Sequence, residues 1–352
     1  MLLSLRSHEV AVAILIMTIP PNYTLTPKIS QLLQSIEASR EVINSITIPP
    51  EIELNIRRQS TLRSSLFSAR IEGNDLTLND LDSTPSKNRK KIEVFNILKA
   101  LNWIGEKSLK DISLKDIFQI HALVLNGLIE EPNLGKFRSK VSAIFNSAGI
   151  AVYMPPPPKQ VQPLIEKLFK FINTSNEQFV PIKDAMTNYT LEKIHPFLDG
   201  NGRVGRLFLQ AVLKKDGYDM KGLLSLEEYL DNHRSAYYFA LEDPERDMTG
   251  FIEFMLEAIA ETAQKAKELV LQKSFDYAED KEKTKIEDYL LPRRAEILNI
   301  IKEHGTVSFD MLHRRFMAIN ERTLRYDLLQ LQKKGLIRKR GATKGVYYEA
   351  IH

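Results

Sequence analysis

One stretch of twelve residues constrains this chain most, the segment His195–Arg206, which reads HPFLDGNGRVGR. Pro196 is expected to end the helix predicted over Lys183–Ile194, because its ring blocks the intrahelical hydrogen bond and disfavours helical geometry in the residue before it. After the turn composition of Asp199–Gly202, apolar residues recur at helical spacing as far as Asp216. The sequence therefore predicts a helix, a tight glycine-rich loop and a second helix.

The residue types in this segment suit the binding of phosphate. A helix N-terminus offers unpaired N–H groups and a positive dipole, glycines allow close approach, and Arg203 and Arg206 add charge. Asp199 can hold a hard cation such as Mg²⁺, which also bridges phosphates. His195 is then the candidate proton acceptor, since its ordinary pKa of about 6.5 suits general-base catalysis at neutral pH. Together these residues predict phosphoryl or nucleotidyl transfer.

The same segment resembles the His-Pro-Phe-x-Asp/Glu-Gly-Asn-Gly-Arg-x-x-Arg signature of Fic (filamentation induced by cAMP) proteins, and every defined position matches. The resemblance extends over about 31–271. It implies a mainly α fold, a helical bundle with a β-hairpin flap, and transfer of AMP from ATP to a protein hydroxyl with release of pyrophosphate. His195 would remove the hydroxyl proton, Asp199 would hold Mg²⁺ and Arg206 would hold the γ-phosphate. The remaining nucleotide contacts are expected from Gly200, Asn201, Gly202, Arg203, Val204 and Gly205.

A second motif precedes this core. The helix predicted over Pro50–Ile71 is expected to end at Glu72 and Gly73, because glycine commonly stops a helix. Ser68, Glu72 and Gly73 match the inhibitory motif of Fic proteins, Ser/Thr-x-x-x-Glu-Gly/Asn, in the subclass whose inhibitory helix lies N-terminal to the core. The resemblance implies that Glu72 takes the guanidinium that the γ-phosphate of ATP needs. A solvated carboxylate at a helix end is the alternative.

A β-hairpin is predicted within this otherwise helical part of the chain. Val141–Ile144 and Ile150–Tyr153 can extend as strands, with Asn146–Gly149 as the turn. The hairpin resembles the Fic flap, which implies that a target protein docks on 141–153 as an added strand and presents a Ser, Thr or Tyr hydroxyl. A purely structural hairpin is the alternative. The prolines at 155–158 cannot join a sheet ladder and are expected to be extended.

Two tyrosines that follow the signature are candidates for the nucleotide base. The resemblance implies that Tyr237 contacts adenine and that Tyr229 is a weaker candidate, with core packing as the alternative for each. Family members often carry an asparagine eight positions after the first tyrosine, but Glu245 stands there, so no hydrogen bond to adenine is assigned. His121 lies on an apolar helix face and is expected to be structural.

The C-terminal segment 292–352 resembles a winged helix-turn-helix domain. Helices are predicted over 293–303, 308–316 and 320–334, followed by a hairpin over 336–348, with 321–329 as the recognition helix. The segment carries 13 Lys and Arg against 6 Asp and Glu, a net charge of +7, and the rest of the chain carries −3. DNA binding is one candidate function for this segment, and a domain that binds protein or sets the oligomeric state, as in a homodimer, is the other.

Composition and pattern predict five regions: an N-terminal arm (1–25), a helical region with the inhibitory helix (26–110), the catalytic core (111–271), a charged linker (272–291) and the winged helix (292–352). The 352 residues, 43% hydrophobic and 27% charged, fit a globular protein of two or three domains. The absence of cysteine excludes disulfides and is compatible with the cytoplasm, where we expect this protein.

The apolar run Val10–Met17 is too short for a transmembrane helix of about 20 residues, so no membrane partner is expected. An apolar arm, or a true start at Met17, are the alternatives for this run. Two rival functions for the whole chain stay open: a nucleotide-responsive DNA-binding regulator, and a hydrolase that removes AMP from a modified protein. The sequence names neither a target protein nor an operator.

Overall fold

The computed structural model describes residues 18–82, 88–145, 151–174, 177–242, 247–281, 290–341 and 346–351. The predictions for the run at 10–17, the hairpin turn at 146–149 and the residue at 245 lie outside these ranges. Within them, no helix is long and apolar enough to cross a membrane.

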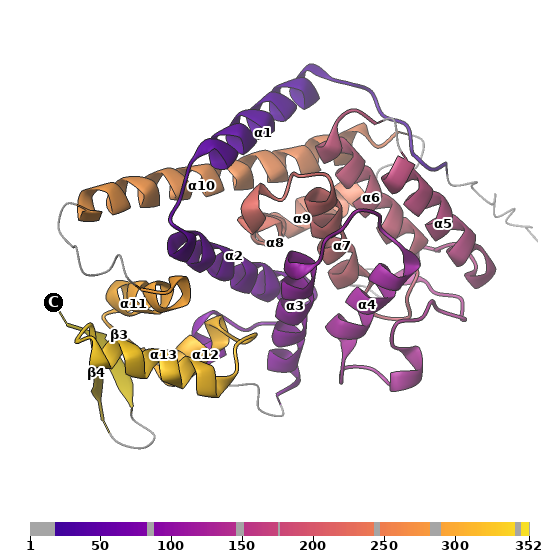
Figure 1. The fold of residues 1–352 in the computed structure, drawn as a ribbon. Helices are drawn as coiled ribbons and strands as arrows, with labels where there is room; N and C mark the ends of the chain where they lie inside the picture. Colours follow the sequence, from indigo (N-terminus) through magenta and orange to yellow (C-terminus); the bar gives the residue numbers. More distant parts are fainter. Residues whose placement is uncertain are drawn as a thin grey trace, which may run out of the picture.

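The described residues between 18 and 281 form a helical bundle in which the first and the last helix pack together. Helix α1 (Pro27–Ser45) packs along α10 (Thr249–Lys281), as Figure 1 shows. Thr26 caps α1, because its hydroxyl accepts the Ile29 N–H at 3.1 Å. Between them follow α2 (Pro50–Ile71), α3 (Arg89–Glu106), α4 (Leu114–Leu125), α5 (Pro158–Thr174), α6 (Val180–Ile194), α7 (Asn201–Lys215), α8 (Leu226–Asn232) and α9 (Arg234–Leu241).

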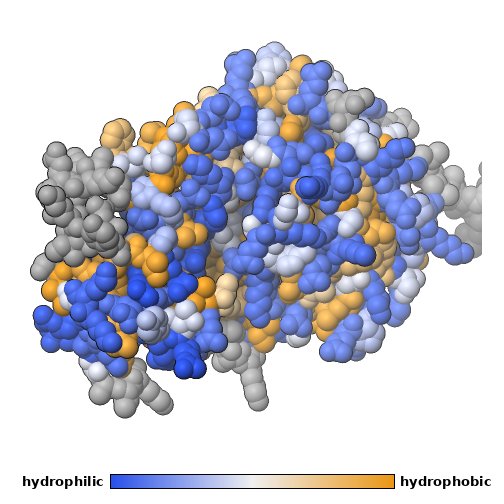
Figure 2. Space-filling model, viewed as in Figure 1, coloured by the Kyte–Doolittle hydropathy of each residue, from blue (hydrophilic) through white to orange (hydrophobic). Residues whose placement is uncertain are grey.

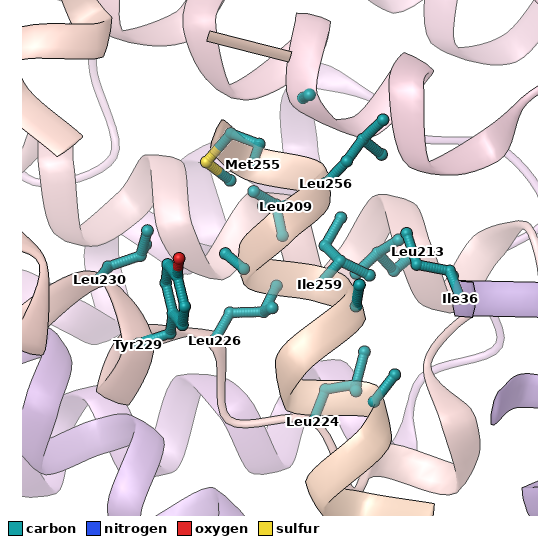
Figure 3. Packing of buried hydrophobic residues seen from close by; sticks show 14 of the residues in the cluster. Ile36, Leu209, Leu213, Leu224, Leu226, Tyr229, Leu230, Met255, Leu256 and Ile259 are labelled. Carbon is teal, nitrogen blue, oxygen red and sulfur yellow. The ribbon is translucent and has the colours of Figure 1, made fainter. Parts of the chain in front are cut away.

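Helices α6 and α7 lie at the centre because they contribute to both hydrophobic cores of the bundle. In one core, Leu209 and Leu213 of α7 meet α8 and α10, where Figure 3 shows Leu230, Met255 and Ile259. The other core takes the opposite face of α7 together with α3, α4 and α5. A buried aliphatic side chain contributes about 1.5–3 kcal/mol, so α7 is held on two sides. The loop that joins α6 to α7 is thereby fixed.

The prediction for the linker after Leu271 needs a correction. Helix α10 continues for ten residues beyond Leu271, through Lys281. The apolar periodicity fades there, but Gln, Lys, Glu and Ala are good helix formers and need no apolar face to remain helical. Lys273 also pairs with Glu303 at 3.0 Å, so this extension contacts the C-terminal domain.

The hairpin is present but shorter than predicted. Strand β1 (Ile144–Phe145) pairs antiparallel with β2 (Ala151–Tyr153), while Val141 lies outside the ladder and is exposed. The hydroxyl of Tyr153 donates to the carbonyl of Lys193 at 3.1 Å and attaches the hairpin to α6. A 3-10 turn forms over Asn79–Asp82. Two further 3-10 turns lie at Glu131–Asn133 and Met220–Gly222.

The C-terminal domain has its own hydrophobic core and a three-stranded antiparallel sheet in the order β3-β5-β4. The hydroxyl of Ser308 accepts the Met311 N–H, and the side chain of Asn320 accepts the Arg322 N–H, so these residues cap the two helices that follow them. Strand β3 was not predicted, because an alternation over only three residues is too short to indicate a strand. The elements are α11 (Pro292–His304), β3 (Thr306–Ser308), α12 (Phe309–Arg315), α13 (Glu321–Lys333), β4 (Ile337–Arg340) and β5 (Tyr347–Ala350). The mainly α fold class is confirmed.

Candidate active site

The signature loop connects the end of α6 to the start of α7. His195 caps α6 in the left-handed conformation (φ 48°, ψ 62°), which agrees with the predicted helix end before Pro196. Asn201 fixes the loop from within: its Oδ1 accepts the Phe197 N–H at 2.8 Å and its Nδ2 donates to the Phe197 carbonyl at 2.9 Å. Its side chain is thus committed to the loop, and only its backbone N–H is available to a phosphate.

Three glycines of the signature lie where neighbouring atoms approach the backbone closely. Gly200, with φ +81°, precedes α7, and a Cβ there would collide with Leu125. A Cβ on Gly202 would collide with the carboxylate of Glu72, and one on Gly205 would lie 2.6 Å from Oε1 of Glu192. The first turn of α7 therefore accepts negatively charged oxygens against its backbone, and a protein carboxylate lies there.

Arg206 is in direct contact with Ser68 and Glu72, as the resemblance implied. The guanidinium of Arg206, 2% exposed, donates from Nη2 to Oε1 of Glu72 at 2.8 Å and to the Ser68 carbonyl at 2.9 Å. Its Nε donates to Oγ of Ser68 at 3.1 Å. Gly73, with φ +95°, lets the chain leave α2 directly after Glu72.

Electrostatics favour this ion pair. Burial alone would raise the pKa of Glu72, but the charge of Arg206 outweighs it and holds that pKa below its ordinary value. Burial likewise opposes the charge of Arg206, yet Glu72 raises its pKa. Both groups are therefore charged at neutral pH. The Glu72 side chain keeps 32% of its surface exposed, so the pair is open on one side.

Arg203 and Asp199 form a second charged group at the loop. Arg203 pairs with Glu93 of α3 and donates from Nη2 to Oδ1 of Asp199 at 2.8 Å. The Gly200 N–H also donates to that oxygen at 2.6 Å, and Oδ2 accepts no hydrogen bond from the described residues. No cluster of three or more His, Asp or Glu in the described ranges is placed to hold a metal ion. One free carboxylate oxygen suits Mg²⁺ that is also bound by substrate phosphates.

His195 is held in a form that can accept a proton. Burial and the nearby charge of Arg138 lower the pKa of His195 to about 4, against the opposing effect of Glu72 and Asp199. Arg138 also donates from Nε to the His195 carbonyl at 2.7 Å and from its backbone N–H to the Pro196 carbonyl at 2.9 Å. The imidazole is therefore neutral at pH 7.

The two tyrosines predicted near the base are both buried. Tyr237 is 1% exposed and donates from its hydroxyl to Oδ1 of Asn188 at 3.2 Å. Tyr229 stacks on His233 with ring centroids 4.1 Å apart, and Figure 3 shows it among the core residues. Tyr238 is 44% exposed. Burial raises the pKa of its phenol, with a further rise from Glu72 and an opposing effect of Arg206. The adenine contacts of Tyr229 and Tyr237 stay predictions.

Sequence reasoning missed three residues at the site: Arg138, Glu93 and Glu192. Burial raises the pKa of Glu192 to about 7, with a further rise from Glu72 and an opposing effect of Arg206. The only available signals were the three-residue spacing of Glu192 from His195 and the arginine before the hairpin. His121 is structural, as predicted: its Nδ1 accepts the Gly135 N–H at 2.9 Å and its ring stacks on Phe197.

Comparison with known proteins agrees with this geometry. Residues 111–213 match the Fic/DOC family, and residues 293–344 match the DeoR-like helix-turn-helix domain. The chain therefore contains a Fic domain followed by a DeoR-like helix-turn-helix domain. It is similar to proteins named protein adenylyltransferase Fic from Drosophila yakuba and Drosophila melanogaster, each 26% identical over 243 residues, or 65% of this chain. The chain spans about half the length of these relatives, 46% and 47% respectively.

Solved structures show the same fold. A Fic family protein from Desulfovibrio desulfuricans G20 is 25% identical, with a TM-score of 0.61, and the match covers 94% of this chain and 98% of that one. Fic-1 (residues 134–508) from C. elegans is 21% identical, with a TM-score of 0.57 over 70% of this chain and 73% of that one.

Proposed function

We propose that this protein is a protein adenylyltransferase, which transfers AMP from ATP to a hydroxyl of a target protein and releases pyrophosphate. The observation that carries the proposal is the anion cradle at the first turn of α7, where Arg206 and the backbone at Gly202 hold a carboxylate beside a neutral His195. The names of the Drosophila relatives support the same reaction.

In this reaction each residue of the loop has a distinct task. His195 accepts the proton of the target hydroxyl as its oxygen attacks the α-phosphate in line, and pyrophosphate leaves. The N–H groups at the start of α7, together with Arg203 and Arg206, hold the phosphates and stabilise the charge that develops on them. Mg²⁺, which Asp199 would hold, neutralises phosphate charge when it is bound. Positioning and electrostatics supply most of the catalysis.

The resting protein is autoinhibited in this proposal. Glu72 occupies the Arg206 guanidinium that the γ-phosphate needs, and its carboxylate covers the backbone at Gly202. ATP can then bind only in a pose that does not lead to transfer. A buried charge-assisted pair of this kind is strong, so relief requires movement of the end of α2.

Labelled ATP tests the proposal. The Glu72→Gly variant is expected to label itself and added protein faster than wild type, and the further change His195→Ala is expected to reduce that labelling about 10²–10⁴-fold. His195→Ala leaves the cradle intact, so nucleotide binding is expected to persist. No labelling by Glu72→Gly, or full labelling by the doubly substituted protein, would contradict the proposed function. Release of AMP from a modified protein would instead favour the hydrolase.

The β1–β2 hairpin is proposed to align the target. An extended segment added to β1 or β2 would present a hydroxyl above the loop, because Tyr153 attaches the hairpin to α6 just before His195. Replacing Val141 by proline in the Glu72→Gly background is a check on the segment that leads into β1. Val141 is exposed and lies outside the ladder, so proline removes a backbone donor there without disturbing the hairpin or the core. Modification of target protein is expected to fall more than self-labelling.

DNA binding by the C-terminal domain is a second candidate function, favoured by the exposed basic residues of α13 and β4. Arg322, Arg325, Arg338 and Lys339 are exposed. Figure 2 shows hydrophilic side chains over α12 and α13, with hydrophobic ones among them. If α13 reads DNA, affinity is expected to fall steeply with salt, and the pair of changes Arg322→Gln and Arg325→Gln to weaken it at every sequence tested. Unchanged complexes between DNA and the doubly substituted protein in gel-shift assays would show that α13 does not contact the DNA. The absence of any complex between DNA and wild type would favour protein binding instead.

A further inference from the structure

A cavity of about 250 Å³ lies where the winged-helix domain meets the helix that carries Glu72. Its walls come from α2, α3 and α7 of the bundle and from the end of α12. Figure 1 shows α11 and α12 beside α2. The two domains are joined next to the cavity, because Arg58 pairs with the fully buried Glu296 at 3.1 Å and lies over the ring of Phe316 at 4.0 Å.

The lining of this cavity carries more basic than acidic side chains, although Arg57 and Arg58 also pair with Glu53 and Glu296. Two acidic residues, Glu106 and Asp219, face a larger number of cations from three separate elements. These cations are Arg57 and Arg58 of α2, Lys214 of α7, and Arg314 and Arg315 of α12.

Two of these cations have neutral hydrogen-bond partners. Lys214 donates from Nζ to the carbonyls of Ile104, at 2.8 Å, and Gly105. Arg315 donates from Nη1 to Oδ1 of Asn55 at 3.1 Å, and its Nη2 lies 3.0 Å from Nε2 of His304. Such partners satisfy the N–H groups without forming an ion pair. Burial lowers the pKa of both Lys214 and Arg315, although nearby carboxylates, Asp219 for Lys214 and Glu303 for Arg315, oppose the fall. An anion in the cavity would pair with both cations directly.

We propose that this cavity binds a small phosphate-bearing anion. Guanidinium and ammonium donors that come from three walls match the tetrahedral oxygens of phosphate better than one planar carboxylate, which a single arginine can satisfy. The cavity is small, and Leu98 and Leu101 on its α3 wall leave an apolar surface for a compact organic group. The ligand class is therefore inorganic phosphate or a small phosphate ester.

A ligand at this position controls α2, a step that rests on the proposed function. Arg57 and Arg58 belong to α2, and Arg315 belongs to α12, so the anion binds only while the winged-helix domain is docked. It then holds α2, whose C-terminal end carries Glu72 on Arg206. The two sites are linked, so the phosphate anion and productively bound ATP weaken each other's binding.

Calorimetry on the full chain tests the binding site without any need for activity. Sodium phosphate is titrated at constant ionic strength into wild type, Arg315→Gln, Lys214→Gln, Arg206→Ala and, as an exposed control on the same domain, Arg322→Gln. Saturable binding is expected to weaken at least tenfold in Arg315→Gln and in Lys214→Gln, and to stay unchanged in the other two. No binding by wild type, or binding that depends on Arg206, would overturn the proposal.

Labelling with ATP tests the control of α2. At saturating ATP, phosphate is expected to slow self-labelling of wild type severalfold, and to leave Glu72→Gly unaffected because α2 then carries no blocking carboxylate. Equal inhibition of both proteins would show that phosphate acts at the active site. That result, or the absence of inhibition in wild type, would overturn the proposal that phosphate controls α2. An inactive Glu72→Gly would contradict the proposed function but not phosphate binding in the cavity, because calorimetry measures that binding independently of activity.

Discussion

The buried guanidinium of Arg206 can pair with only one anion at a time. In the structure its charged partner is Glu72, and Ser68 accepts further hydrogen bonds from its Nε and Nη2. Because Arg206 is 2% exposed, it cannot turn toward another partner without a change in its surroundings. Exchange of Glu72 for a phosphate is therefore a competition for one buried guanidinium.

The first prediction follows from this competition. Glu72→Gly is expected to gain transfer because it frees Arg206, and Arg206→Ala in the same chain is expected to abolish the gain. The measurement is incorporation of labelled AMP by the single and the doubly substituted protein. Glu228→Gly, which removes a half-buried carboxylate partner of Arg63 away from the signature loop, is the matched control and should leave AMP transfer unchanged. If the doubly substituted protein is as active as Glu72→Gly, the gain in AMP transfer does not come from the freed guanidinium of Arg206.

The second prediction concerns the pH dependence of transfer by Glu72→Gly. The pKa of His195 is lowered to about 4 by burial and Arg138, so the imidazole stays neutral and able to accept a proton from pH 8 down to about 5. Loss of Glu72 removes one opposing charge and lowers this pKa further. The ratio kcat/KM is therefore expected to be flat between pH 5.5 and 7.5, with circular dichroism showing a folded protein throughout. A midpoint near 6.5, where an ordinary histidine titrates, would contradict this assignment.

At the scale of elements, the loop between α6 and α7 owes its shape to Asn201. Its two hydrogen bonds to the backbone of Phe197 are buried, so Asn201→Ala would leave that N–H and carbonyl without partners. The expected loss is about 1–3 kcal/mol in the free energy of unfolding, and a lower thermal midpoint. Asn232→Ala, at an exposed position at the end of α8, serves as the control. Equal midpoints for Asn201→Ala and wild type would remove Asn201 from this role.

Helices whose ends are marked by a capping residue, a glycine or a proline could be predicted from the sequence. Thr26 and Pro27 open α1, Gly73 closes α2 and Pro196 follows α6, since each acts through its own backbone or side chain. The extension of α10 and strand β3 depend on contacts with distant segments, such as Lys273 with Glu303. Such contacts leave no periodic signal in the sequence.

The candidate site divides in the same way. Residues within the signature, and Glu72 in its own motif, could be found from the sequence because their spacing is fixed along the chain. Glu93, which pairs with Arg203 from α3, and Arg138, which bonds the backbone of His195, could not. Their positions depend on how separate elements pack. The burial of Tyr237 is likewise set by α10 and α6 rather than by its own helix.

At the scale of the whole molecule, the winged-helix domain is joined to the bundle through a buried charge pair. Arg58 keeps 24% of its side chain exposed, whereas Glu296 has none, so the carboxylate loses most of its hydration in the contact. The attraction between such charges often fails to offset that loss. The pair therefore sets which surfaces meet and adds little to their stability.

The last prediction tests this contact through pH. Burial raises the pKa of Glu296 to about 7, although Arg58 and Arg315 oppose the rise. A carboxyl with a raised pKa in the folded protein binds its proton more tightly there than in the unfolded chain. Its contribution to the free energy of unfolding is therefore complete below about pH 4.5 and is lost as the pH rises through 7, by about 3 kcal/mol.

Glu296→Gln mimics the protonated carboxyl at every pH and removes this loss. The thermal midpoint of the variant is expected to equal that of wild type near pH 4.5 and to exceed it at pH 8. Glu321→Gln is the control, because that carboxylate is more than half exposed and its midpoint should follow wild type at both values. A Glu296→Gln protein less stable than wild type at pH 8 would show that the attraction to Arg58 outweighs the cost of burying the charge, and that the contact holds the two domains together by electrostatics.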